Sequence, residues 1–203
     1  MEYYEYQEEF IANDSLVKLC LWPRRSGKST SLAECVVREV RKTYEEETYK
    51  SKSIAIVGPT KAYTQYIMEE ITKNLFYDEI KSYRSGCLEL KSGHTVYTFS
   101  STPSSLLRGQ QRFYDMVVLD GIDWIRPEDM KVAREAIVVP SLGIGIIASV
   151  TSREDFAGSS ELYTPKERGY RCMFNSPGKD NIVELLNYDK CFVSLKDIED
   201  ANV

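Results

Sequence analysis

Short apolar runs alternate along the chain with segments whose apolar residues recur at helical spacing. Runs of strand length occupy residues 16–22, 53–57, 116–119 and 144–150. Between them, apolar residues recur every three or four positions, which predicts helices that bury one face. The residues that mark these helices are Leu32, Ala33, Val36, Val37 and Val40, then Tyr63, Ile67, Ile71 and Leu75, and, after Pro127, Met130, Ala133, Arg134 and Ile137. Strands that alternate with helices predict an α/β fold, with a mainly parallel central sheet flanked by helices on both faces.

A second pattern lies between the second and third of these runs. Residues 87–90 and 95–99 flank the tetrapeptide Lys-Ser-Gly-His, which predicts a β-hairpin insertion with Gly93 in its turn. The only histidine of the chain, His94, belongs to this turn. We expect its side chain to be exposed to solvent and to take no part in catalysis.

Length and composition fit one globular domain. The chain has 203 residues, of which 42% are hydrophobic and 28% charged, so it can bury a sizeable core. We expect the core of the domain over residues 1–158. The tail over residues 159–203 is more polar and less periodic, so we expect it to form a lid- or linker-like segment of the same domain.

Charge and cysteine usage narrow the class further. The net charge of −5 argues against a chain that coats nucleic acid by charge alone, but it leaves room for a local basic patch. The five cysteines are odd in number, widely spaced and without a C-x-x-C pair, which predicts reduced thiols in an intracellular protein. No apolar run reaches membrane-span length, and the N-terminus does not have the pattern of a signal peptide.

The candidate chemistry begins in the stretch from Trp22 to Thr30, which contains Gly27-Lys28-Ser29. This is the core of the phosphate-binding loop pattern G-x-x-x-x-G-K-[ST], with Trp22 in place of the first glycine. The glycine lets successive N–H groups point at phosphate oxygens, the lysine reaches the β- and γ-phosphates, and the serine hydroxyl is a Mg²⁺ ligand. A strand before the loop and a helix after it complete the context that such a site requires. The sequence therefore predicts a nucleotide site here.

A phosphate loop of this kind needs an acidic partner for Mg²⁺. Asp120 directly follows the apolar run of residues 116–119, at the end of a predicted central strand. An isolated aspartate at such a position is often a turn or cap residue. The phosphate loop upstream in the same α/β chain favours the magnesium role.

The order of these motifs resembles that of the ATPase domain of viral large terminases and, more distantly, that of helicase-like ATPases. Tyr6-Gln7 resembles the glutamine motif that contacts adenine, and residues 23–29 resemble the terminase phosphate loop. Arg108-Gly109 resembles the Arg-Gly pair that precedes the acidic strand in terminases, and residues 146–152 resemble the coupling motif. The resemblance covers residues 6–155. It implies a RecA-like P-loop NTPase fold.

The resemblance also implies roles for individual residues. The ligands would be ATP and Mg²⁺, with Ser29 and Asp120 holding the metal. Arg24 would sense the γ-phosphate in cis and join Lys28 and Asp120 as a catalytic residue. The residues expected to bind the nucleotide are Gln7, Arg25, Ser26, Gly27, Lys28, Ser29, Thr30 and Thr151. Two of these have ordinary alternatives, since Arg25 could be a solvated arginine and Gln7 a surface glutamine.

One departure from the family pattern concerns hydrolysis. Terminases and helicases follow the magnesium aspartate with a glutamate that orients the attacking water, whereas this chain has Gly121. Asp123 could substitute for it, a second chain in a ring could supply the acid, or the protein could bind ATP and hydrolyse it poorly or not at all. A helicase-like translocase and a non-hydrolysing ATP-binding assembly subunit therefore remain alternatives.

The resemblance further implies partners and a setting. A terminase motor acts on double-stranded viral DNA together with a portal and a small terminase subunit, as a homo-oligomeric ring without a membrane. It works inside the infected host cell, in a bacterial cytoplasm or in the nucleus or cytoplasm of a eukaryotic host. A complete large terminase adds a nuclease domain, and we expect none here because the residues after Gly158 show no apolar strands ending in paired acids.

Overall fold

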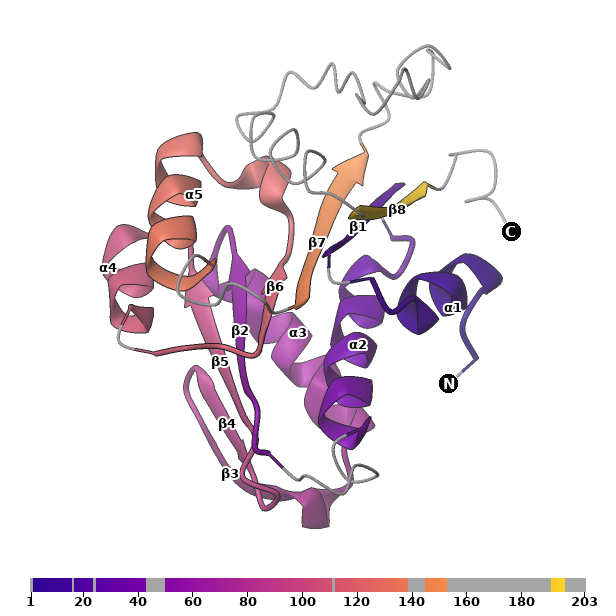
Figure 1. The fold of residues 1–203 in the computed structure, drawn as a ribbon, viewed down its shortest axis with the longest axis vertical. Coiled ribbons are helices and arrows are strands. Elements are labelled where there is room, and N and C mark those ends of the chain that lie inside the picture. The colour runs from indigo at the N-terminus through magenta and orange to yellow at the C-terminus, as the bar shows by residue number, and fades with distance from the viewer. Residues whose placement is uncertain are drawn as a thin grey trace.

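An eight-stranded sheet forms the centre of the molecule (Figure 1). The computed structural model describes residues 2–15, 17–23, 25–42, 50–110, 112–138, 145–152 and 191–195. The strands are β1 (Val17–Pro23), β2 (Ser53–Gly58), β3 (Ile80–Arg84), β4 (Cys87–Leu90), β5 (Thr95–Ser100), β6 (Met116–Leu119), β7 (Gly145–Ser152) and β8 (Cys191–Leu195). Their order across the sheet is β3-β4-β5-β2-β6-β7-β1-β8.

The sheet is parallel from β5 to β8, which confirms the predicted fold class. All four apolar runs are strands of this parallel part, with boundaries within two residues of those expected. The predicted hairpin is also present, because β4 pairs antiparallel with β5. The strand β3 extends this hairpin by a second antiparallel pairing and was not predicted. Its alternation of exposed and half-buried residues gives a weak signal at the edge of the sheet.

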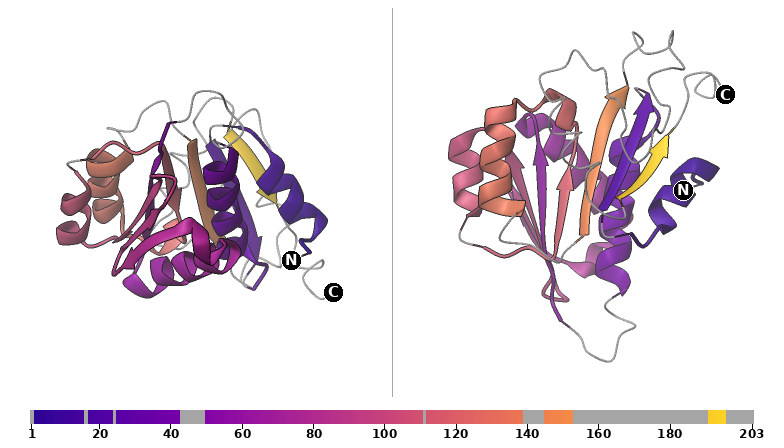
Figure 2. Two further views of the ribbon diagram at one scale, coloured as in Figure 1. Left: turned by 90° about the horizontal axis from the view of Figure 1, so that it is seen from below. Right: turned by 45° about the horizontal axis from the view of Figure 1, so that its top comes forward.

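Helices cover both faces of the sheet (Figures 1 and 2). One face carries α1 (Glu5–Ala12), α2 (Lys28–Lys42) and α3 (Lys61–Asn74). The other carries α4 (Pro103–Leu106), α5 (Pro127–Ala133) and η4, a π-helical turn over Arg134–Val138. The short turns η1 (Tyr77–Glu79), η2 (Leu107–Gly109) and η3 (Ile122–Trp124) complete the described elements.

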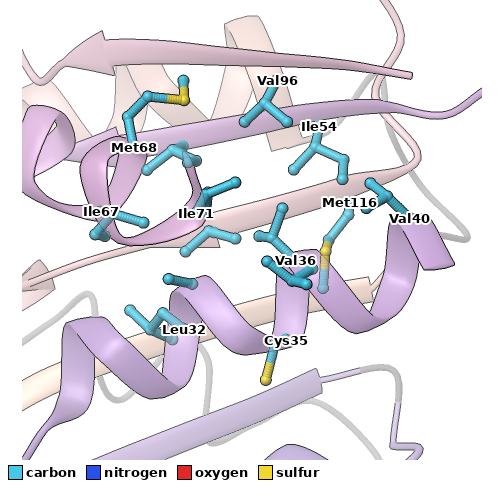
Figure 3. Packing of buried hydrophobic residues seen from close by; sticks show 14 of the residues in the cluster. Leu32, Cys35, Val36, Val40, Ile54, Ile67, Met68, Ile71, Val96 and Met116 are labelled. Carbon is cyan, nitrogen blue, oxygen red and sulfur yellow. The ribbon is translucent and has the colours of Figure 1, made fainter. Parts of the chain in front are cut away.

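The two cores follow from the alternation of side chains along β1. Leu19 and Leu21 belong to the cluster under α4, α5 and η4, whereas Cys20 and Trp22 belong to the cluster under α1, α2 and α3. Figure 3 shows part of the second cluster. There apolar side chains of α2 and α3, among them Leu32 and Ile71, pack against those of the sheet. Most of the residues at helical spacing face a core, as expected: those of α2, with Ile67, Ile71 and Leu75, face this cluster, and Met130, Ala133 and Ile137 face the other. Tyr63 and Arg134, which were expected on the same helix faces, are exposed instead.

Three other features bear on the sequence predictions. Among the described residues, no helix combines the length and apolar character needed to cross a membrane. Cys20, Cys35 and Cys87 are free thiols, as predicted. Within the expected tail segment of residues 159–203, the structure describes Cys191–Leu195, which adds the edge strand β8 beside β1. The division of the chain at residue 158 stays a prediction.

The expected exposure of His94 is wrong. Its side chain is fully buried, and its Nδ1 accepts a hydrogen bond of 2.9 Å from the backbone N–H of Lys52. Gly93 lies against Ser51, so residues 51 and 52 cover the hairpin turn. The sequence had predicted that this turn is exposed to solvent. Burial, and next the charge of Lys52, lower the pKa of His94 below its ordinary value of 6.5.

This burial makes the stability of the domain sensitive to mildly acidic pH. The unfolded chain protonates His94 at its ordinary pKa, while the folded chain resists protonation, so stability falls as pH falls below 6.5. We expect urea denaturation to show a lower free energy of unfolding at pH 5.5 than at pH 7.5. Since His94 is the only histidine, His94→Gln should remove most of that difference. An equal pH dependence in both proteins would contradict this prediction.

Candidate nucleotide-binding site

The predicted phosphate loop connects the end of β1 to the beginning of α2. Helix α2 begins at Lys28, and the N–H of Ser31 donates a 2.9 Å hydrogen bond to the carbonyl of Gly27. Arg25 and Gly27 both adopt left-handed backbone conformations, with φ of 63° and 78°. Such conformations in a loop before a helix turn backbone N–H groups inward and form a concavity that suits anions. For Arg25, a non-glycine residue, the conformation is strained, and such strain concentrates at functional sites.

Gly27 is required by a close approach as well as by its backbone angle. A Cβ atom at this position would lie 2.1 Å from Nε2 of Gln7, a separation that no real contact allows. The same amide nitrogen donates a 3.0 Å hydrogen bond to the carbonyl of Ser26. The glycine of the motif therefore also makes room for the side-chain amide of Gln7, which would otherwise have to move.

Lys28 is nearly buried at the base of the loop. Its Nζ donates a 2.9 Å hydrogen bond to the backbone carbonyl of Trp22, the residue before the last in β1. A buried ammonium group needs such partners, because its transfer out of water is costly. Lys28 is thus held at the loop, where the motif places the phosphates.

The two predicted magnesium ligands meet although they lie far apart in sequence. The hydroxyl of Ser29 donates a 3.2 Å hydrogen bond to Oδ2 of Asp120. Asp120 is buried and directly follows β6, and its N–H donates to the carbonyl of Val57 at the end of β2. A hydroxyl and a carboxylate oxygen are the hard ligands that Mg²⁺ prefers, together with water and phosphate oxygens. The residues present therefore fit Mg²⁺.

The position after Asp120 has a conformation that favours glycine. Gly121 has φ of 62° and ψ of 45°, in the left-handed region, and precedes the turn η3. A Cβ atom there would have ordinary contacts of 3.4 to 3.5 Å with Tyr63 and Pro59, so space is available. The backbone, however, would be strained by about 1–2 kcal/mol with an L-residue in this conformation. A glutamate in this position would therefore carry that strain, as Arg25 does in the loop.

Helix α1 joins the site through two adjacent side chains. The hydroxyl of Tyr6 donates a 2.9 Å hydrogen bond to the carbonyl of Ser26, which also accepts from Gln7. Oε1 of Gln7 accepts from the N–H of Tyr4 at 2.9 Å. Gln7 is buried, which rules out the surface alternative, and its contact with adenine stays a prediction. The sequence placed Tyr6 in the glutamine motif, but its hydrogen bond to Ser26, 20 residues away, leaves no local signal.

Trp22 explains how the loop tolerates the loss of its first glycine. The residue is the sixth of β1, and its fully buried side chain lies on the face covered by α1. The ring packs edge-on against Tyr6 at 4.9 Å and Phe10 at 5.3 Å between centroids. Its Nε1–H donates a 3.0 Å hydrogen bond to the hydroxyl of Ser194 in β8. The tryptophan thus belongs to the core that supports the loop.

The remaining predicted residues are placed in part. Thr151 lies opposite Trp22 in the pairing of β7 with β1, so the end of the coupling motif runs beside the beginning of the loop. Thr30 is half-buried in the first turn of α2, and the Arg25 side chain is exposed. Arg24 lies outside the described residues, as does the side chain of Asp123. Within the described part of the chain, no three acidic, cysteine or histidine side chains gather into a metal cluster.

These features define a class of protein. A loop of this conformation lies between a first strand and a helix, with an aspartate at the end of a parallel strand of the same sheet, which is the arrangement of the P-loop NTPase fold. The solved structures that the chain resembles include ATPase domains of phage large terminases, and the chain has their fold.

Comparison with solved structures supports this fold, although the sequence identities are low. The ATPase domain of the large terminase of Thermus phage P74-26 matches with a TM-score of 0.58 and 16% identity, covering 96% of this chain and 80% of that domain. The large terminase of a thermophilic bacteriophage matches with a TM-score of 0.58 and 15% identity over 74% of this chain, and this chain covers 39% of that protein. The same terminase in complex with ADP has a TM-score of 0.58, 11% identity and coverages of 98% and 46%. The sequence matches no protein-family model and no curated protein.

Proposed function

We propose that this chain is the ATPase domain of a viral DNA-packaging terminase large subunit. It would couple ATP binding and hydrolysis to the translocation of double-stranded DNA into a capsid. The observation that carries the proposal is the meeting of Ser29 and Asp120 at 3.2 Å beside the buried Lys28. A terminase with the same fold was solved in complex with ADP, which supports nucleotide binding by this chain.

The roles of the residues follow from their chemistry. The inward N–H groups of residues 25–28 would bind the phosphates, and the Lys28 ammonium would stabilise charge that develops on the transferred phosphoryl group. Ser29 and Asp120 would hold Mg²⁺, which neutralises charge on the β- and γ-phosphates. Arg24 would supply a second positive charge in cis. Thr151, beside the loop through β7, would pass the loss of the γ-phosphate to the moving parts of the motor.

The proposal extends to partners and setting. The chain would act in the infected host cell, in a homo-oligomeric ring on a portal, with a small terminase subunit and viral DNA. The chain spans less than half the length of the large terminase of the thermophilic bacteriophage. A ring that contacts DNA through phosphates suits a task that is independent of sequence.

Asp123 is our candidate for orienting the attacking water. It is the second residue of η3, the turn that begins directly after the left-handed Gly121. We expect Asp123→Asn to lower kcat for ATP hydrolysis by about 10²-fold, the lower end of the range for a positioned base. ATP affinity, measured with a fluorescent analogue, should stay unchanged because the phosphate loop is intact.

Gly121→Glu serves as the control for this assignment. Because its backbone is left-handed, a glutamate there should not raise turnover, and the variant should lose stability. An Asp123→Asn protein with wild-type kcat would show that Asp123 takes no part in hydrolysis.

A second candidate is a subunit that binds ATP without hydrolysing it. Gly121 favours it, because the backbone at the usual glutamate position suits a residue without a side chain. Steady-state turnover in the presence of Mg²⁺ and DNA separates the two. Turnover equal to that of Lys28→Ala, together with normal ATP binding, would overturn the motor and establish the binding subunit.

A further inference from the structure

Two adjoining hollows form a continuous groove on the side of the sheet that carries the β-hairpin. They have volumes of about 280 and 320 Å³ and share Lys61, Thr64, Ser85, Gly86 and Thr98 among their lining residues. The groove, which we call the basic groove, runs between the beginning of α3, the turn between β3 and β4, the strand β5, and η2. Because the hollows share these walls, one extended ligand could occupy both.

The groove is strongly positive in a protein that is negative overall. Its charged lining residues are Lys61, Arg84, Arg108 and Arg112, and no aspartate or glutamate lines either hollow. All four cations are exposed, while the whole chain has a net charge of −5. Concentrating positive charge in a concave surface raises the local potential and attracts polyanions.

Carboxylates neutralise several other cations of the described surface. Elsewhere, ion pairs with carboxylates hold Arg38, Arg41, Lys42, Lys52, Lys73, Lys81 and Arg126. None of the cations of the basic groove forms an ion pair with a described residue. Arg112 instead lies over the ring of Tyr97, with 4.5 Å to its centroid, and donates to its hydroxyl at 3.0 Å. The groove charges are therefore available to an outside ligand.

One carboxylate lies near the end of the groove. Glu69 raises the pKa of Tyr83, as a smaller cause than burial. Its Oε1 accepts a hydrogen bond from Gln65, and it lines neither hollow. Tyr83 lines the groove with half of its surface exposed. A lysine, arginines and an exposed aromatic ring in one groove are a combination that binds nucleic acid through phosphates and base stacking.

We infer that the basic groove binds the phosphodiester backbone of nucleic acid, independently of sequence. The inference rests on and deepens the proposed motor function, since it says where the translocated polymer would be held. A short segment, residues 59–64, borders both sites. Pro59 and Tyr63 lie within about 3.5 Å of the Cβ position of Gly121, while Lys61 and Thr64 line the groove. The groove is therefore next to the nucleotide site, and its occupation could act on hydrolysis through this segment.

The test is binding of fluorescent DNA by anisotropy without nucleotide, between 50 and 200 mM salt. A duplex and a single strand of the same length are compared. We expect Lys61→Ala and Arg84→Ala each to weaken binding several-fold for all sequences, and to lower the slope of log K against log salt by about 1. Arg84→Lys should restore the slope because it keeps the charge.

Lys81→Ala is the matched control, since Lys81 lies on the same hairpin but pairs with Glu89 and does not line the groove. It should leave affinity and slope unchanged. Unchanged affinity and slope in Lys61→Ala and Arg84→Ala would contradict the assignment of the groove to nucleic acid. So would a loss of DNA binding in Lys81→Ala equal to that in the groove variants.

A wild-type protein that hydrolyses ATP but binds neither the duplex nor the single strand would overturn the assignment of the groove and leave the proposed ATPase activity standing. Loss of DNA binding in groove variants of a protein without turnover would support the groove and overturn the motor.

Discussion

Lys28→Ala is expected to lower kcat/KM for ATP hydrolysis by about 10³-fold. The lysine is the cation that the loop brings to the transferred phosphoryl group, and one such preorganised charge contributes 10²- to 10³-fold or more. Its burial strengthens the effect, because charge interactions gain strength where water is excluded. Phosphate release under saturating Mg²⁺ measures the loss, and binding of an ATP analogue should weaken as well.

Lys42→Ala is the matched control for this variant. Lys42 is the last residue of the same helix, α2, and pairs at the surface with Asp14 at 2.9 Å. Both partners of that ion pair are largely exposed, and such surface pairs contribute little to stability. Lys42→Ala should therefore keep wild-type turnover. If Lys28→Ala and wild type turned over ATP at the same rate, the loop would have no part in hydrolysis.

The sequence was sufficient for the parts of the fold that depend on local pattern. The runs of residues 16–22, 53–57 and 116–119 are mostly apolar because parallel strands are covered on both faces, and each is a strand within a residue or two. The pairing of Ser29 with Asp120 was also predictable, since carboxyl ends of parallel strands meet at one edge of the sheet. The loop motif identified Ser29, and the apolar run before it identified Asp120.

Contacts between distant segments could not be predicted in this way. The Lys-Ser-Gly-His turn predicts an exposed histidine from its local sequence. The ring of His94 is buried because residues 51 and 52, from another segment, pack over it. Helix α1 was not predicted from the apolar pattern, and the contact of Tyr6 and Gln7 with the carbonyl of Ser26 is seen only in the fold. The conformation of Gly121 is likewise set by the turn into η3. In each case the deciding partner lies in another element.

Restoring the glycine of the phosphate-loop pattern is expected to damage the protein. Trp22→Gly removes a fully buried side chain that packs on Tyr6 and Phe10 and donates to Ser194. Truncation of a buried tryptophan costs about 3–5 kcal/mol, and glycine within a strand adds to this. Since domains of this size have total stabilities of about 5–15 kcal/mol, we expect Trp22→Gly to unfold at a much lower urea concentration. Its ATP affinity should not rise.

Two further variants divide this effect into its causes. Trp22→Phe keeps most of the packing and loses the hydrogen bond to Ser194, so it should cost about 1 kcal/mol for that bond plus a smaller packing loss. Trp124→Ala, at a ring that is 43% exposed, should cost clearly less than Trp22→Gly, because less apolar surface leaves a buried site. A Trp22→Gly protein as stable as wild type, with tighter ATP binding, would mean that the tryptophan only obstructs the loop. The result expected here makes it the link between the loop, helix α1 and the edge strand β8.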